Sequence, residues 1–232
     1  MAEGSYNQFC PVAMAAEILC TRWTVVLLRE LVAGSTRFNE LRRGVPRMSP
    51  ALLSKRLKDL ETAGILTRTK AAGQRDVHEY ALTAAGQDLG RVVEAIGEWG
   101  QHWVSTESSL GKLDANLLMW DMRRSLNTKP MPPRRSVIQV IFSDLPEVRR
   151  NWWLIVAPGE EVDLCSVDPG FDVDLYLVTD LRTMTEIWMG YIPVARAKAD
   201  GRVTTTGSRQ LEASLQSWLG LSAFARFEKF VA

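Results

Sequence analysis

Apolar positions recur with a helical period along the first part of the chain. The runs at residues 12–20 and 23–33 predict two apolar helices. Residues 37–43 form a shorter amphipathic segment, which predicts a third helix with Phe38 and Leu41 turned inward. The pattern therefore indicates several short helices around one core.

The next predicted helix has the clearest boundaries. Ser49 has a side chain that can cap free backbone N–H groups, and Pro50 suits the first helical position, where its missing donor costs nothing. Leu53, Leu57 and Leu60 follow on one face. The small and basic opposite face, with its flanking positions, holds Ala51, Leu52, Ser54, Lys55 and Lys58. One side of this helix therefore faces the core, and the other is free for a partner.

A wing and a long helix complete this region. Residues 66–82 predict a two-stranded wing, and residues 83–104 predict a helix with a continuous apolar stripe. Beside the stripe lie four glycines, each costing about 1 kcal/mol relative to Ala in a helix: Gly86, Gly90, Gly97 and Gly100. Close approach of another helix would explain them, either within one subunit or in an isologous dimer. We favour the homodimer, because helix-turn-helix proteins read paired half-sites.

The second part of the chain has a different pattern. Residues 105–112 are polar and contain a glycine, which predicts a linker between a domain at 1–104 and a domain at 113–232. Beyond it we expect helices near residues 116–126, 182–189 and 210–219 and strands near 137–142, 152–156, 162–167, 171–178 and 202–206. Strands first and helices afterwards predict an α+β domain.

Length and composition limit the class of protein. With 232 residues and 46% hydrophobic content, the chain is long enough for two domains with cores. We expect no membrane association, because no run approaches the roughly 20 apolar residues of a spanning helix and residues 1–9 lack a signal pattern. The three cysteines, Cys10, Cys20 and Cys165, show no metal-ligand spacing. A cytoplasmic location is expected.

Charge identifies a partner for the basic helix face. Residues 37–75 hold ten Lys or Arg against three acids, whereas residues 76–104 hold one against five. A charge run alone is usually a solvated surface, but here it coincides with helix-turn-helix spacing and a wing, so double-stranded DNA is the expected partner. The residues expected to read the major groove are Ser49, Pro50, Ala51, Ser54 and Lys55. Those expected on phosphates are Arg37, Arg47 and Lys58, with Arg75 of the wing on the minor groove or backbone.

The first 104 residues resemble the HxlR family of bacterial winged helix-turn-helix regulators. The matching segments are Cys10-Pro11-Val12, Arg22-Trp23, residues 37–41, residues 53–60, Gly64 and residues 79–83. One position departs, because the family usually has Gly-Lys before the tryptophan, whereas Thr21 and Arg22 stand here. The positive charge is kept. The resemblance implies a DNA-binding regulator of transcription.

Residues 113–225 are similar to sterol-carrier-protein-2-type domains. The similarity lies in residues 174–188, Gly190, residues 199–203, Gly207 and residues 211–219. It implies an apolar ligand tunnel and therefore a sensor of an apolar small molecule. Aromatic and methionine side chains suit such a pocket, although each is more often plain core. The candidates are Phe142, Trp152, Trp153, Phe171, Met184, Trp188 and Met189.

Cys10 is a candidate redox residue. Some members of the HxlR family sense oxidants through a cysteine at this place, and a helix N-terminus lowers the pKa of a thiol. The same Cys-Pro pair also occurs in the family without evident redox work. Oxidant sensing through Cys10 and a purely structural role therefore both remain open.

The sequence predicts a ligand-responsive repressor that binds a pseudo-palindromic operator as a homodimer. Ligand in the second domain would change the distance between the two DNA-reading heads. The alternative is a lipid or hydrophobe carrier whose first half mainly dimerises. An enzyme is third, because the sequence offers no nucleophile and base pair and no phosphate-binding glycine loop. We expect no catalytic residues, metal or cofactor.

Overall fold

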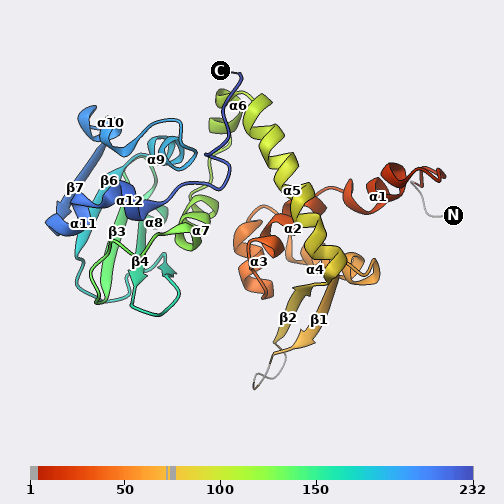
Figure 1. Cartoon of the computed structure of the whole chain (residues 1–232). Helices are drawn as coiled ribbons and strands as arrows, with labels where there is room; N and C mark the ends of the chain where they lie inside the picture. Colours follow the sequence, from red (N-terminus) through yellow and green to blue (C-terminus); the bar gives the residue numbers. More distant parts are fainter. Residues whose placement is uncertain (1–4, 72, 74–76, 232) are drawn as a thin grey trace. The chain divides into compact units, whose positions relative to one another are not determined.

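The computed structural model describes residues 5–71, 73 and 77–231 (Figure 1). The chain divides into two compact units, residues 1–97 (unit 1) and residues 98–232 (unit 2). The division lies inside the long helix α5 (Ala84–Trp103), so the end of this helix belongs to unit 2.

In its described residues, unit 1 contains four helices, a two-stranded wing and most of α5. The elements before α5 are α1 (Pro11–Leu19), α2 (Thr24–Val32), α3 (Phe38–Gly44), α4 (Pro50–Thr62), β1 (Leu66–Lys70) and β2 (His78–Leu82). β1 and β2 are antiparallel with Leu66 opposite Leu82, and they project from the helices as a hairpin (Figure 1). This order confirms the predicted winged helix-turn-helix.

Leucines dominate the core of unit 1. The predicted inner face of α4 is confirmed, because Leu53, Leu57 and Leu60 are at most 2% exposed. They pack in one cluster with leucines of α2 and with Leu41 of α3. By contrast, α1 contributes no buried residue. The three-helix body is therefore fixed by apolar packing, and α1 packs on it through the partly buried Leu19.

Unit 2 combines a five-stranded sheet with short helices. Its strands are β3 (Ser136–Phe142), β4 (Asn151–Val156), β5 (Asp163–Cys165), β6 (Leu175–Thr179) and β7 (Val203–Gly207). Its helices are α6 (Thr106–Leu110), α7 (Ala115–Ser125), α8 (Glu147–Arg150), α9 (Leu181–Trp188), α10 (Val194–Ala199), α11 (Arg209–Ala213) and α12 (Leu215–Leu219). The unit is an α and β structure.

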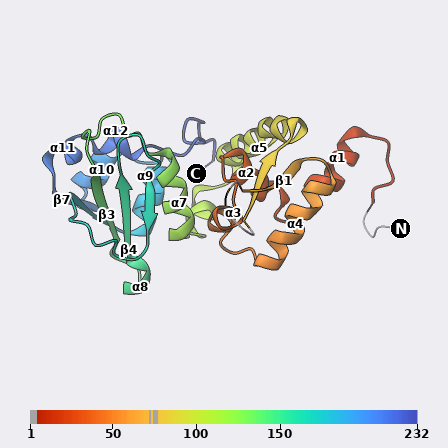
Figure 2. The same ribbon diagram turned by 90° about the horizontal axis from the view of Figure 1, so that it is seen from below.

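The sheet has β3 at its centre. The strand order is β5-β4-β3-β6-β7, and Figure 2 shows β3 beside β4. Only β3 and β6 pair in parallel, with Ile138 opposite Leu175, and the other neighbours are antiparallel. Side chains of β3, β4 and β6 form the core of the unit together with α7, α9 and α12.

The structure corrects three sequence expectations in unit 2. The predicted linker 105–112 contains helix α6, because the Ser105 hydroxyl caps it by accepting from the Ser108 N–H at 3.3 Å. The strand expected at 171–178 begins only at Leu175, since the preceding Asp174 carboxylate accepts from Val137 N at 2.8 Å. The helix expected at 210–219 is divided at Ser214 into α11 and α12.

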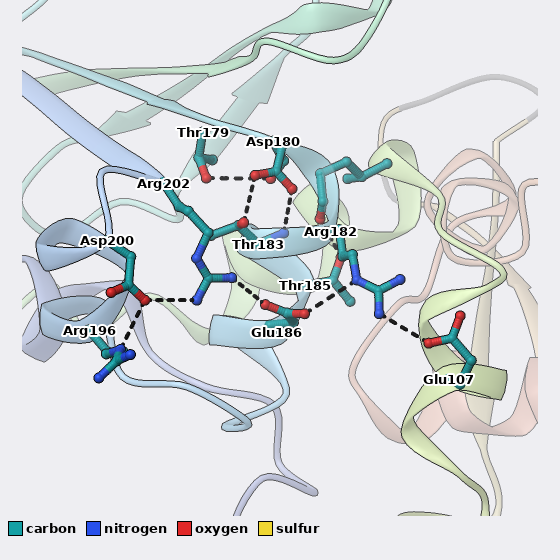
Figure 3. A network of polar contacts seen from close by, with 11 residues as sticks. Glu107, Thr179, Asp180, Arg182, Thr183, Thr185, Glu186, Arg196, Asp200 and Arg202 are labelled. Atoms are coloured by element: carbon teal, nitrogen blue, oxygen red, sulfur yellow. Dashed lines mark hydrogen bonds and ion pairs between the residues drawn. The ribbon is translucent and has the colours of Figure 1, made fainter. Parts of the chain in front are cut away.

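A chain of ion pairs connects α6 to α9 and α10 (Figure 3). Arg182 of α9 donates to Glu107 of α6 at 3.1 Å and also pairs with Glu186 at 3.4 Å. The Glu186 carboxylate, 16% exposed, then pairs with Arg202 at 2.8 Å, and Arg202 continues to Asp200. These contacts tie the short helix after α5 to the body of unit 2.

Among the described residues no single helix is long and apolar enough to cross a membrane. Only α1 and α2 taken as a pair, bent by 84° at their junction, reach the length and composition required.

Candidate nucleic-acid interface

The exposed face of α4 matches its sequence prediction. Ser49 caps the helix, its hydroxyl accepting from the Leu52 N–H at 3.3 Å, and Pro50 occupies the first turn. Ala51, Ser54, Lys55 and Lys58 are all exposed, and Leu52 is half-buried. The predicted base-reading residues therefore share one accessible surface at the start of a well-capped helix, the part of a recognition helix that enters a major groove.

A basic groove lies between α3, α4 and the wing. Its volume is about 730 Å³, and it is lined by Arg37, Phe38, Asn39, Glu40, Arg43, Ser54, Arg68, Val77, His78 and Tyr80. The lining contains three arginines and a single acid, Glu40. The Glu40 carboxylate accepts from the backbone N–H groups of Thr36 and Arg37, at 2.9 and 3.0 Å. The groove therefore suits the phosphates of a nucleic-acid backbone.

Arg37 has a structural contact as well as a place in this groove. Its guanidinium donates to Glu79 of β2 through Nε at 3.2 Å and Nη2 at 3.1 Å. A backbone hydrogen bond joins the same two segments, because Tyr80 N of β2 donates to Thr36 O, just before α3, at 2.8 Å. Arg37 thus joins the start of α3 to the wing. Its contact with phosphate stays a prediction.

The other expected phosphate contacts are distributed around α4. Arg47 is exposed in the turn between α3 and α4, and Lys58 is exposed on α4 itself. Arg75 lies outside the described residues. One of the two described side chains therefore precedes α4, and the other lies within it.

Three residues of the groove, Arg43, Arg68 and His78, are not among the site residues expected from the sequence. Arg68 of β1 and His78 of β2 lie 3.2 Å apart, Nη2 to Nδ1, across the wing. The count of basic residues included the two arginines, but only the folded hairpin brings them to the groove that Arg37 lines. These three residues add positive charge and a hydrogen-bonding ring to the interface.

A buried carboxylate positions α3. Glu30 of α2 is fully buried and accepts from Arg29 Nη2 at 2.6 Å, while the same nitrogen donates to Gly44 O at 2.9 Å. A Cβ on Gly44 would lie 1.9 Å from the Glu30 carboxyl carbon, so any other residue at the end of α3 would displace this buried carboxylate. This connection fixes α3 against α2, and the apolar pattern of α2 gave no sign of it.

Thr83 joins the wing to α5. Its hydroxyl donates to Gly64 O at 2.7 Å and accepts from Gly86 N at 3.2 Å. Gly86 lies against the backbone of Ile65, where a Cβ would come within 2.1 Å of the carbonyl oxygen. Packing within one subunit therefore accounts for this glycine. Gly90 faces Val32 at an ordinary distance, and Gly100 faces open space within the described part of the chain.

Most of the ligand candidates in unit 2 are core residues. Phe142, Trp152, Met184 and Trp188 belong to the buried cluster of this unit. The adjacent Trp152 and Trp153 are 6% and 7% exposed, so neither side chain faces solvent. Both faces of β4 are covered.

The two remaining ligand candidates lie apart from this cluster or at its edge. Phe171 is 41% exposed, with the Arg135 guanidinium 4.7 Å from its ring centre. Met189 packs against the edge of the core and lines a surface cavity. The surroundings of these two side chains therefore differ from those of the four candidates in the buried cluster.

Cys10 precedes α1 directly, with Pro11 at the first helical position. Hydrogen bonds from the backbone N–H groups of Ala13 and Val12 lower the pKa of its thiol. The position at a helix start is as expected from the sequence. Redox activity stays a prediction.

Comparisons with known proteins concern the N-terminal region. The family model described as HxlR-like helix-turn-helix matches residues 18–108. The chain is 33% identical over 99 residues to the uncharacterized HTH-type transcriptional regulator YvaP of Bacillus subtilis, covering 42% of this chain and 92% of YvaP. It is 34% identical over 102 residues to sll1512 of Synechocystis, another uncharacterized HTH-type transcriptional regulator, covering 44% and 76%. The reduced form of the transcriptional regulator YodB from B. subtilis superimposes with a TM-score of 0.37 and 28% identity, covering 42% and 96%.

Proposed function

Because the chain belongs to the HxlR-like helix-turn-helix family and is a DNA-binding transcriptional regulator, we propose that it is a homodimeric, ligand-responsive repressor. Each copy would insert α4 into one half-site of a pseudo-palindromic operator. The observation that carries this proposal is the exposed, small and basic surface of α4 beside the groove lined by Arg37, Arg43 and Arg68. No catalytic step is part of the proposal, and the protein would act in the cytoplasm, where its DNA is.

Exposed apolar side chains support the homodimer. α1 buries none of its residues, and Val12 and Met14 on it are 75% and 58% exposed. On α5, Leu89 and Val93 pack into the core of unit 1, while the rest of the stripe is exposed: Val92, Ile96, Trp99 and Trp103. Apolar surface of this extent marks an interaction site. A second copy covering α1 and α5 would remove it from water.

The similarity of residues 113–225 to sterol-carrier-protein-2-type domains supports a ligand-binding role for unit 2. In the proposed regulator, ligand would change the spacing of the two α4 helices. Half-sites about 34 Å apart fit only one such spacing. Relief of repression by ligand follows, because a changed spacing lowers operator affinity.

The test is a gel shift with the promoter DNA next to the gene. Lys55→Ala removes a base contact, so specific affinity should fall by about 1–3 kcal/mol. Lys58→Ala removes a phosphate contact, so the slope of log affinity against log salt should fall by about 1. Lys129→Ala in unit 2, also exposed, is the control and should change neither.

Unchanged operator affinity in both α4 variants would contradict the assignment of this helix. A hydrophobe carrier would instead leave no footprint on DNA and would exchange its ligand with membranes. Native mass spectrometry of the purified protein shows whether a small molecule accompanies it.

A further inference from the structure

The segment after α12 forms a strap across part of unit 2. The strap, residues 222–231, begins where Ser222 N donates to Trp188 O at the end of α9, at 2.8 Å. It ends where Phe230 N donates to His102 O at the end of α5, at 3.0 Å. The rings of His102 and Phe230 stack there, with centres 4.2 Å apart and planes inclined by 3°. The strap therefore connects the last turn of α5 with the end of α9.

A cavity of about 700 Å³ lies along the strap. Its walls include Gln101 of α5, Thr106 of α6 and Met189 and Tyr191 after α9, with Phe227 and Lys229 on the strap side. The strap packs closely against Gly190, because a Cβ added to Gly190 would lie 3.0 Å from the Cβ of Ala225. This volume lies within the range of small-molecule sites, about 300–1,000 Å³.

The lining combines aromatic faces with hydrogen-bonding groups. Tyr191, Phe227 and Phe230 supply aromatic rings, and Gln101 supplies an amide on a side chain that is 6% exposed. The Tyr191 hydroxyl is buried without a hydrogen-bond partner in the described part of the chain. Leaving such a group unsatisfied costs about 1–3 kcal/mol. Because this hydroxyl has no access to solvent, a ligand in the cavity accepts a hydrogen bond from it, and removes that cost, only after the Tyr191 side chain shifts toward the ligand.

The charges along the strap favour an anion. The cavity is lined by two cations, Arg226 and Lys229, and by a single acid, Glu228. The Arg226 guanidinium lies 4.8 Å from the centre of the Phe227 ring, and the Lys229 ammonium lies 5.4 Å from that of Tyr191. Positive charge beside aromatic faces suits a ligand that combines a flat ring with a carboxylate.

We propose that this cavity binds a planar aromatic molecule bearing one carboxylate. The ring packs against Phe227 and Met189, the carboxylate lies near Arg226 and Lys229, and Tyr191 donates a hydrogen bond. This inference rests on the proposed function, a ligand-responsive regulator, and adds to it the site and the chemical class of the ligand. Because the strap grips the end of α5, ligand binding acts on the helix that carries the exposed apolar stripe.

The experiment is calorimetric titration of the full chain, without DNA, with 2-naphthoate and with its neutral isostere 2-naphthamide. We expect saturable binding of one naphthoate per chain and at least about fivefold weaker binding of the amide. The double variant Arg226→Gln/Lys229→Gln should weaken naphthoate binding by a similar factor. Arg209→Gln, an exposed arginine on α11, is the matched control and should leave it unchanged.

A filling variant tests the location. Thr106→Trp places a large side chain in the cavity and should abolish binding, with circular dichroism showing that the variant is folded. No saturable binding of naphthoate, or binding unchanged in both the double variant and Thr106→Trp, overturns the site. Operator binding is measured separately, so loss of DNA recognition with intact naphthoate binding would refute the regulator and leave this site standing.

Discussion

Gly86 and Gly100 lie on the same helix, α5, and replacing each by alanine should have opposite effects on stability. A Cβ on Gly86 would lie 2.1 Å from the carbonyl oxygen of Ile65 and 3.0 Å from Leu82 Cδ2. A Cβ on Gly100 meets nothing within 4 Å in the described part of the chain. The pair therefore separates a glycine required by packing from one that is not.

The magnitudes follow from helix propensity and overpacking. Alanine in place of a helical glycine stabilises a helix by about 1 kcal/mol, and Gly100→Ala gains this in full. At Gly86 the obstacle is the Ile65 backbone carbonyl, which accepts from the Thr83 N–H at 3.0 Å and is therefore not free to rotate away. Overpacking of this kind costs about 3 kcal/mol. The net loss for Gly86→Ala is therefore about 2 kcal/mol.

Differential scanning calorimetry of both variants measures these effects. One kcal/mol shifts the Tm of a domain of 60–100 residues by about 4–8 °C, so Gly86→Ala should lower the Tm of unit 1 by roughly 8 °C or more. Gly100→Ala should raise the Tm of its transition by a few degrees. Equal Tm values for Gly86→Ala and the parent chain would refute the close packing of α5 on Ile65.

Gly100→Ala also tests the dimer. Sedimentation of this variant shows whether a partner helix approaches closely at Gly100, because the added methyl group would then weaken association. An unchanged dimer with raised Tm would place the contact elsewhere along the exposed stripe of α5.

Three further predictions concern a cap, an ion-pair network and a thiol. Ser49→Ala should cost about 1 kcal/mol in urea denaturation, because the Leu52 N–H loses its acceptor, and an unchanged midpoint would contradict the cap. Glu186→Gln should lower the free energy of unfolding by about 1–2 kcal/mol, because the Glu186 carboxylate is 16% exposed and pairs with Arg202 at 2.8 Å. Glu107→Gln is the control: its carboxylate is 80% exposed, so the Tm should not change. The lowered pKa of the Cys10 thiol keeps its thiolate populated at lower pH. In a Cys20→Ser/Cys165→Ser background, alkylation of Cys10 should therefore reach its half-maximal rate below about pH 8.5, the ordinary pKa of a cysteine thiol. A midpoint at or above that pH would count against the backbone hydrogen bonds to the thiol.

Local signals explain why α4 was predictable. Ser49, Pro50 and the three leucines at helical spacing each act within a few residues, and the structure confirms all of them. The wing was equally predictable from the sequence, because its two strands are neighbours along the chain. By contrast, the Arg37–Glu79 ion pair joins residues far apart in sequence and depends on how β2 lies against α3. Residue composition does not specify how two such distant segments pack against each other.

Unit 2 shows a different limit. Trp152 and Met184 are pocket candidates by residue type alone, but residue type does not distinguish a core from a cavity wall. The Ser and Gly content of residues 105–112 indicated a linker, yet Ser105 is a helix cap. The sequence does not indicate the strap residues as ligand-binding candidates. Phe227 and Lys229 line the cavity only because the chain folds back toward α5 and Tyr191.

The most direct test of the central proposal, a dimer that reads DNA through α4, is selection of bound sequences from random DNA by the full chain. The proposal predicts enrichment of an inverted repeat whose half-sites are centred about 10–10.5 base pairs, or a multiple of this, apart. It also predicts that Lys55→Ala loses this enrichment. Failure to enrich any sequence, or an enriched motif without two-fold symmetry that Lys55→Ala leaves unchanged, would contradict it.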